Sequence, residues 1–199
     1  MKELTTLLSH IPNIKEANVN LLIGFMSHLR ILLAFFSWTG NTRFVAQEIS
    51  QYFSINNQVD ICEIQPKKSH GYFYWLLLSL IPGFKIKNQF TINNISDYDL
   101  LILGSPKWTF NSPPISEYLD SLIGYNNKMI ALFITFGGYG EKKYVHKLEK
   151  KLIKKGLRPI ASLYIKRNSI NKHEYHKTII SFCNNIESIA HKKNLKQVK

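Results

Sequence analysis

From Arg30 onward, short apolar runs alternate with longer segments in which apolar residues recur at helical spacing. Each run has the length of a strand, and most are nearly continuously apolar, which is typical of strands buried on both faces. This alternation predicts a parallel sheet with helices on both faces. The predicted strands are Ile31–Phe36, Val59–Ile64, Leu100–Gly104, Met129–Thr135 and Ile160–Ile165.

Five helices are predicted between and after these strands, which makes a five-fold βα repeat. They cover Thr42–Phe53, Tyr72–Leu80, Ile115–Ile123, Lys142–Lys155 and about Lys172 to His191. We expect one domain over residues 26–199, because a chain of 199 residues leaves little room for two. Residues 1–25 fall outside the repeat and are predicted to be an N-terminal extension, with Met26 as a candidate natural start.

A turn rich in hydroxyl groups follows the first predicted strand and leads into a helix. It reads Ser37-Trp38-Thr39-Gly40-Asn41-Thr42. Backbone N–H groups, three hydroxyls and the positive end of the helix dipole would face one anion here, and a phosphate monoester fits. An ordinary N-cap turn is the alternative interpretation, because Ser and Thr favour that place. The G-x-x-x-x-G-K-[ST] loop of nucleotide triphosphatases does not occur.

At this turn the sequence resembles the flavodoxin family. Ser37, Thr39, Gly40 and Thr42 match the family's phosphate-loop pattern [ST]-x-T-G-x-T position for position. The resemblance implies a flavodoxin-like, doubly wound α/β fold with five parallel strands in the order 2-1-3-4-5, and FMN at the switch point between strands 1 and 3, as is known for flavodoxin itself. It also implies that the turn from Ser37 to Thr42 holds the FMN phosphate.

Two further loops support the resemblance, because a ligand in such a sheet lies across the C-terminal ends of strands 1, 3 and 4. After the third strand, Gly104-Ser105-Pro106-Lys107-Trp108 and the following residues to Ile115 are similar to the G-[ST]-P-x-W…P-P-I segment of one flavodoxin-like subgroup. After the fourth strand comes a glycine-rich loop similar to that of flavin-binding members. The cofactor-binding residues implied in these loops are Pro106, Lys107, Trp108, Thr109, Phe110, Asn111, Thr135, Gly137, Gly138, Tyr139 and Gly140.

An isoalloxazine ring needs a flat aromatic or apolar wall and backbone groups along its polar edge. Trp108 is the best candidate for the wall, whereas Phe110 and Tyr139 serve equally well as loop-anchoring core aromatics. The aromatic segment 71–76 is similar to the same subgroup's G-[FY]-x-x-[FWY]-L segment. Core packing is its first interpretation, and a lid edge, a dimer surface or a membrane-surface contact are alternatives. No side chain is needed as a general acid or base.

Positive charge is concentrated near the C-terminus. The net charge is +13, and residues 141–199 carry 16 basic and 4 acidic side chains. Lysines at helical spacing favour a solvated helical face, although nucleic acid, an anionic membrane surface or an acidic protein would also fit. Many electron-carrying flavodoxins are acidic instead. We therefore predict acidic redox partners and a less negative potential for the fully reduced couple than in acidic flavodoxins.

Three functions are open at this point. The first is an FMN-binding electron carrier between protein partners. The second is an NAD(P)H-dependent quinone or flavin reductase that uses bound FMN, although the chain has no second dinucleotide-binding βαβ unit. The third is a cofactor-free binder of nucleic acid or anionic surfaces through the basic C-terminal region. Aromatic residues are not interleaved with the lysines, which argues against nucleic acid.

The other sequence signals favour a cytoplasmic protein without a metal site. No apolar stretch reaches the roughly 18–20 residues that spanning a membrane requires, and no signal-peptide pattern is present. Cys62 and Cys183 lie far apart and are predicted to be small buried residues. His173 and His176 share a helical face but have no third ligand nearby, so no metal is expected.

Overall fold

The five predicted strands form one parallel sheet in the computed structural model, which describes residues 28–68, 71–172 and 174–197. Their order is β2-β1-β5-β6-β7, which confirms the predicted order 2-1-3-4-5 of the five main strands. The proposed N-terminal extension and His173 lie outside the described residues. The strands are β1 (Arg30–Phe35), β2 (Gln58–Glu63), β5 (Leu100–Lys107), β6 (Met129–Phe136) and β7 (Arg158–Lys166).

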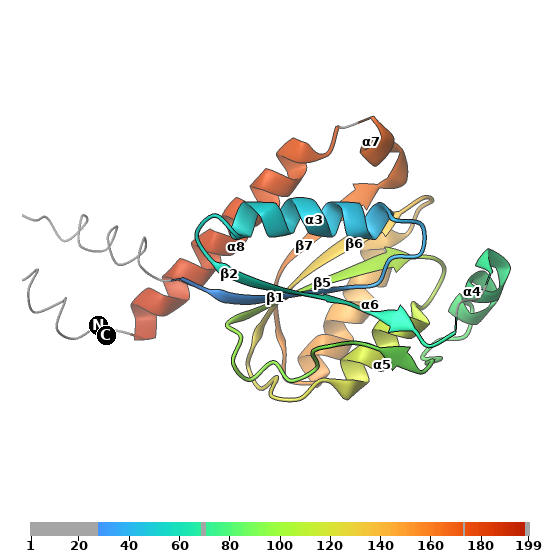
Figure 1. Cartoon of the computed structure of the whole chain (residues 1–199), viewed down its shortest axis with the longest axis horizontal. Coiled ribbons are helices and arrows are strands. Elements are labelled where there is room, and N and C mark those ends of the chain that lie inside the picture. The colour runs from blue at the N-terminus through green and yellow to red at the C-terminus, as the bar shows by residue number, and fades with distance from the viewer. Residues whose placement is uncertain (1–27, 69–70, 173, 198–199) are drawn as a thin grey trace, which may run out of the picture.

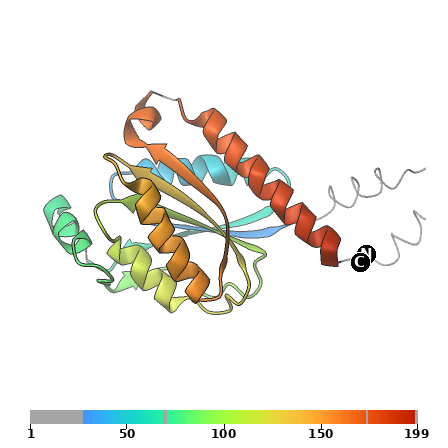
Figure 2. The same ribbon diagram turned by 180° about the vertical axis from the view of Figure 1, so that it is seen from behind.

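Helices cover both faces of the sheet (Figures 1 and 2). Consecutive side chains of a strand point to opposite faces, so Leu32 and Leu33 of β1 enter two separate hydrophobic cores. Both residues are fully buried, which explains why the strands read as continuous apolar runs. One face carries α3 (Asn41–Phe53) and α8 (His176–Gln197), and the other carries α5 (Pro113–Ser121) and α6 (Glu141–Lys154).

The structure differs from the sequence prediction at three short elements. The helix predicted from about Lys172 begins at His176 as α8, and a separate short helix, α7 (Arg167–Asn171), precedes it. The chain also forms β3 (Gln65–Pro66) and β4 (Asn88–Gln89), which pair antiparallel outside the main sheet. Elements of two to five residues contain too few positions for a periodicity to show, which is why the sequence does not predict them.

The aromatic helix α4 (Tyr72–Ser79) stands at the edge of the domain, toward the C-terminal ends of the parallel strands (Figure 1). Its inner side is packed, because Trp75 and Ser79 have no exposed surface. Core packing, the first interpretation of this segment, is therefore correct for that side. The outer side carries the exposed side chains of Phe73 and Leu77.

An ion-pair cluster holds the end of α5. The Asp120 carboxylate lies 2.5 Å from Lys85 Nζ, 3.5 Å from Lys155 Nζ and 3.6 Å from Lys151 Nζ. Partial burial opposes ionisation of Asp120, but the hydrogen bond from Lys85 and the charges of the three lysines outweigh it and lower its pKa.

We expect the Asp120→Asn variant to lose about 0.5–1 kcal/mol of stability at pH 7, because the cluster is partly solvated. The pKa of Asp120 is lower in the folded than in the unfolded chain, so its stabilisation is complete above the unfolded pKa of about 3.9 and is lost as the pH falls through the folded value. Urea unfolding at pH 7 and at pH 3 checks this. The difference between the two proteins should be smaller at pH 3 than at pH 7, and a constant difference would contradict the ion-pair assignment.

Candidate cofactor site

The first turn of α3 lacks a side-chain cap. Gly40 occupies the N-cap with φ of 84°, a left-handed conformation that glycine adopts at low cost, and no described side chain bonds to this helix end. The first bond into the helix is donated by the Phe44 N–H to the Gly40 carbonyl, at 2.9 Å. The N–H groups ahead of Phe44 therefore have no acceptor within the helix. This argues against an ordinary N-cap turn and leaves an anion site at the positive end of the helix dipole.

The hydroxyl groups of the preceding turn are also available to a ligand. Ser37 Oγ is buried and has no hydrogen-bond partner among the described residues. Asn41 Nδ2 donates to Thr39 Oγ1 at 2.9 Å, so the Thr39 hydroxyl proton is left to donate elsewhere. A buried hydroxyl without a partner is costly, and an acceptor in the turn would remove that cost. The residues predicted to hold a phosphate therefore fit one.

A hydrogen bond joins the first turn of α3 to the end of β6. Thr42 Oγ1 and Thr135 Oγ1 lie 2.7 Å apart, and both side chains are buried. One hydroxyl donates in this bond, which leaves the proton of the other available. The bond connects positions 93 residues apart in the chain, and it holds the start of α3 against the end of β6.

A pocket of about 150 Å³ adjoins the turn at the C-terminal ends of β5 and β6. It brings together residues predicted from all three loops. These are Thr39, Asn41, Pro106, Lys107, Trp108, Thr135, Gly137 and Gly138, and the pocket is completed by Leu76, Phe136 and Arg167.

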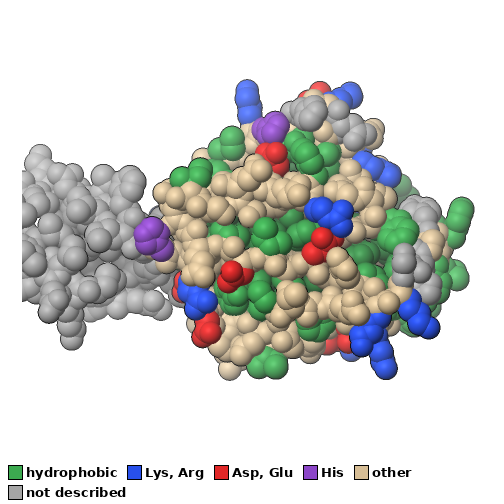
Figure 3. Space-filling view, in the orientation of Figure 1, with side chains coloured by type: hydrophobic (Ala, Val, Ile, Leu, Met, Phe, Trp, Pro, Cys, Tyr) green, Lys and Arg blue, Asp and Glu red, His purple; other side chains and the backbone are tan. Residues whose placement is uncertain are grey.

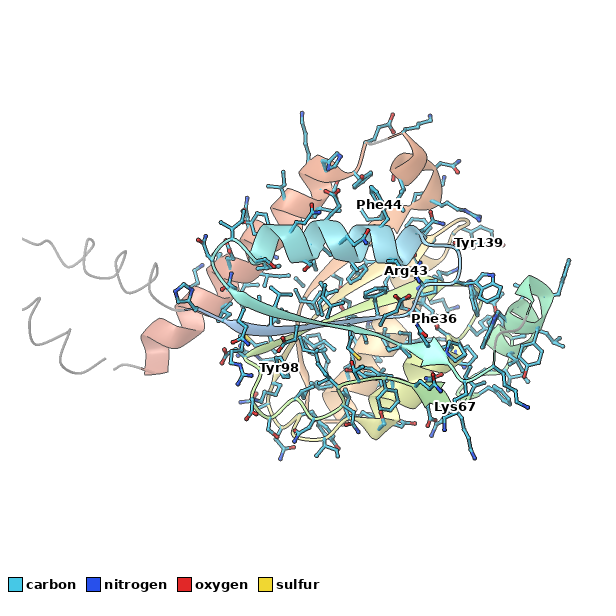
Figure 4. The ribbon with its side chains drawn as sticks, in the orientation of Figure 1. Phe36, Arg43, Phe44, Lys67, Tyr98 and Tyr139 are labelled. Atoms are coloured by element: carbon cyan, nitrogen blue, oxygen red, sulfur yellow. The ribbon has the colours of Figure 1, made fainter. Side chains whose placement is uncertain are left out.

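The other predicted site residues do not line the pocket. Tyr139 lies at the exposed tip of the loop after β6, beside the start of α3 (Figure 4). Asn111 Nδ2 donates to the Phe84 carbonyl at 2.8 Å, and the Thr109 hydroxyl is hydrogen-bonded to that of Ser79, so these two residues fasten the second loop to the α4 region. The predicted residues outside the lining are Ser37, Trp38, Gly40, Thr42, Thr109, Phe110, Asn111, Tyr139 and Gly140.

One wall of the pocket is aromatic and is anchored from behind. Trp108 packs against Trp75 with ring centroids 5.8 Å apart, and its edge meets Phe36 at the same distance. Trp38 contacts Trp75 from another direction at 6.1 Å. Trp75 is fully buried between these two half-buried tryptophans. The predicted ring-facing residue, Trp108, is therefore held in place by Trp75 of α4 and by Phe36.

A buried tyrosine supports the C-terminal end of β5. Tyr144 of α6 lies with its hydroxyl oxygen 3.1 Å from Ser105 Oγ, directly before Pro106 of the pocket. Burial raises the pKa of Tyr144 to about 12, and the hydrogen bond with Ser105 acts weakly in the other direction. Tyr144 is therefore neutral at physiological pH and contributes a fixed hydrogen bond to the end of β5.

Sequence reasoning did not place Arg167, Leu76 or Phe136 in the site. Arg167 follows β7 directly, and a side chain added at Gly137 would collide with its guanidinium group. The sequence could have indicated Arg167, because a residue that follows a parallel strand lies at the same edge of the sheet as the C-terminal ends of the other strands. Leu76 had no comparable signal, because only tertiary packing brings α4 to the pocket.

Several other sequence predictions concern titratable side chains. Cys62 and Cys183 are buried, as predicted. His176 is exposed, and its Nδ1 lies 3.1 Å from Glu48 Oε2. Over the described part of the chain, no three His, Cys, Asp or Glu side chains form a group that could hold a metal ion. Within the same residues, no helix has both the length and the apolar character to cross a membrane.

Comparison with known proteins yields one sequence relative and many similar structures. No protein-family model matches the chain. An uncharacterized protein of Archaeoglobus fulgidus is 29% identical over 141 residues, which cover 71% of this chain and 88% of the relative.

Among solved structures, the chain is similar to a flavoprotein of Lactobacillus acidophilus in complex with FMN, with a TM-score of 0.58 and 23% identity over 72% of this chain and 97% of that one. A flavodoxin from the domain Archaea has a TM-score of 0.51 and 17% identity, covering 80% of this chain and 99% of its own. Together with the strand order and the two-sided helix layers, these similarities show that the chain has the flavodoxin-like fold.

Proposed function

We propose that this protein binds FMN at the three-loop pocket and transfers electrons between redox partners. The observation that carries the proposal is the uncapped start of α3 beside the unpartnered hydroxyl of Ser37, because this arrangement is complementary to a phosphate group. The similar flavoprotein of Lactobacillus acidophilus holds FMN, which supports the choice of ligand.

Each part of the pocket has a role in holding the cofactor. The turn from Ser37 to Thr42 binds the phosphate, Trp108 faces the ring, and backbone groups around Pro106 and Gly137–Gly140 contact the polar edge of the ring. When bound, FMN supplies the electron-transfer chemistry. The protein contributes binding, orientation and the electrostatic field around the ring, and none of its side chains acts as a general acid or base.

The first test is a visible absorption spectrum of the purified protein after incubation with FMN and removal of unbound ligand. We expect retention of about one equivalent of FMN, because the proposed site holds one phosphate and one ring. A folded protein that retains no flavin would overturn the proposal. The basic C-terminal region would then be tested for nucleic-acid binding, which falls steeply as salt is raised.

An NAD(P)H-dependent quinone or flavin reductase is the second candidate function. Two cationic side chains, Lys107 and Arg167, line the pocket and offer contacts to the phosphates of a dinucleotide donor. Oxidation of NADPH by the FMN-loaded protein, followed by the loss of NADPH absorbance, separates the two functions. Turnover with a quinone acceptor supports the reductase, and its absence supports the carrier.

The same proposal extends to the redox partners and the cellular location of the protein. A net charge of +13 favours acidic redox partners, which approach faster when the charges are complementary. We also propose a cytoplasmic location, because both cysteines are free and buried, which suits a reducing compartment.

The charge of Arg167 should raise the reduction potential of the bound flavin. A positive side chain at the pocket favours the reduced, more negative cofactor, so we expect the Arg167→Gln variant to have a potential on the order of 20–30 mV more negative. The matched control is Arg158→Gln. Arg158 is the first residue of β7, whereas Arg167 directly follows the last residue of β7, so the two arginines lie at opposite ends of this strand. A redox titration checks the result, and equal shifts in both variants would contradict a local effect of Arg167.

A further inference from the structure

The outer side of α4 is apolar and exposed to solvent. Phe73, Leu77 and Leu80 are 81%, 63% and 46% exposed. Their spacings of four and three residues place them on one side of the helix. Leu80 directly follows α4, and Ile81, which is 48% exposed, comes next in the chain. An apolar helix face of this kind on a protein surface marks an interaction site.

Three lysines surround a hollow beside this helix. Lys67, Lys68 and Lys87 line a space of about 260 Å³ together with Tyr74 of α4 and Ile86. The pairing of β3 with β4 places them there, and the Lys67 N–H donates to the Lys87 carbonyl at 3.1 Å.

The three lysines are available to an anionic partner. None of them forms an ion pair with an acidic side chain of the described chain, whereas the neighbouring Lys85 pairs with Asp120. Lys67 lies at the outer edge of the domain near α4 (Figure 4).

The apolar side chains and the lysines lie at the same edge of the domain. Figure 3 shows hydrophobic side chains at the edge where α4 lies, with basic side chains gathered next to them. We propose that this α4 surface, made of Phe73, Leu77, Leu80, Ile81, Lys67, Lys68 and Lys87, docks the protein on an anionic lipid bilayer. The apolar side chains enter the boundary between headgroups and acyl chains, and the lysines contact lipid phosphates.

Charge complementarity favours a bilayer over a second copy of the chain. A symmetric dimer through the α4 surface would place two clusters of three lysines on one interface, between chains that each carry a net charge of +13. An anionic bilayer instead offers an apolar interior and negative phosphates side by side. This combination is what an apolar face bordered by lysines matches.

The test is flotation of the full chain with vesicles of phosphatidylcholine, alone and with added phosphatidylglycerol. We expect binding to the anionic vesicles only. Leu77→Ser removes an exposed apolar contact and should weaken binding about tenfold. The combined substitutions Lys67→Gln, Lys68→Gln and Lys87→Gln should weaken it at least about tenfold.

Two matched control variants test whether binding depends on the α4 surface or on any exposed apolar or basic side chain. Ile55 is exposed at the far end of α3, and Lys142, Lys143 and Lys150 are exposed on α6. Ile55→Ser and the combined Lys142→Gln, Lys143→Gln and Lys150→Gln should each change binding less than about twofold. Circular dichroism of every variant confirms that it is folded.

Three outcomes would overturn the proposal. The first is no binding to either kind of vesicle. The second is equal weakening by the α4-surface variants and their controls, which would assign binding to the overall charge. The third is a sedimentation mass that doubles in the wild type and falls to a monomer in Leu77→Ser, which would assign the surface to a second copy. Each result is independent of whether the pocket holds FMN.

Discussion

The Thr39→Asp variant is expected to bind FMN at least about a hundredfold more weakly than the wild type. Thr39 lines the pocket at the uncapped start of α3, where its hydroxyl accepts a hydrogen bond from Asn41 and has its own proton left to donate. A carboxylate there would repel the FMN phosphate. Two unit charges 4 Å apart repel by about 4 kcal/mol near a protein surface, and a hundredfold loss needs about 2.8 kcal/mol.

Quenching of FMN fluorescence on titration with protein measures this change. The matched control is Thr178→Asp, an exposed position in the first turn of α8, where a carboxylate is tolerated and lies outside the pocket.

Ser37→Ala provides a second test. It removes a buried hydroxyl that has no partner in the free protein, so stability should stay equal or rise while FMN affinity falls about tenfold. Unchanged FMN affinity in both Thr39→Asp and Ser37→Ala would refute the assignment of this turn as the phosphate site.

Replacing Gly104 by alanine is expected to destabilise the protein by about 3 kcal/mol or more. A Cβ atom at this position would overlap the ring of Phe133 on the neighbouring strand β6, and Phe133 is fully buried. The clash lies in the centre of the sheet, where β1, β5 and β6 pair and where neighbouring side chains have little room to move. Overpacking at such a site is among the most costly single substitutions.

Urea unfolding of the cofactor-free protein measures the loss. Gly71→Ala is the matched control, because Gly71 has open space around it and a negative φ, and it should cost less than about 1 kcal/mol. The double variant Gly104→Ala with Phe133→Leu makes room for the methyl group. It should be more stable than the sum of the two single changes by at least about 1 kcal/mol. A loss below about 1 kcal/mol in Gly104→Ala alone would contradict the close packing of β5 on β6.

The strands were predictable because each is a run of apolar residues bounded by polar ones. The predicted strand Ile31–Phe36 differs from β1 by one residue at each end. The third strand differs more, since Leu100–Gly104 was predicted and β5 continues to Lys107. Ser105, Pro106 and Lys107 extend the strand because their backbone pairs with β6. Their side chains carry no strand signal, so only the partner strand reveals the extension.

The loops of the candidate site were predictable from the sequence, and the contacts that hold these loops in place were not. Three loops are readable because each follows a strand, and parallel strands bring their C-terminal ends to one edge. The hydrogen bond between Thr42 and Thr135 and the packing of Trp108 on Trp75 join distant parts of the chain. No local pattern encodes such pairs.

The strand order was implied by the resemblance to the flavodoxin family. The sequence by itself determined the layers and the three loops at the sheet edge. These depend on local properties, namely the period of apolar residues and the types of residue after each strand. The tertiary structure alone decided which hydroxyl is left without a partner, that Arg167 completes the pocket, and that one side of α4 is buried while the other faces solvent. Those properties depend on what distant segments supply as neighbours, and a helix that is apolar all round does not show which side the rest of the chain covers.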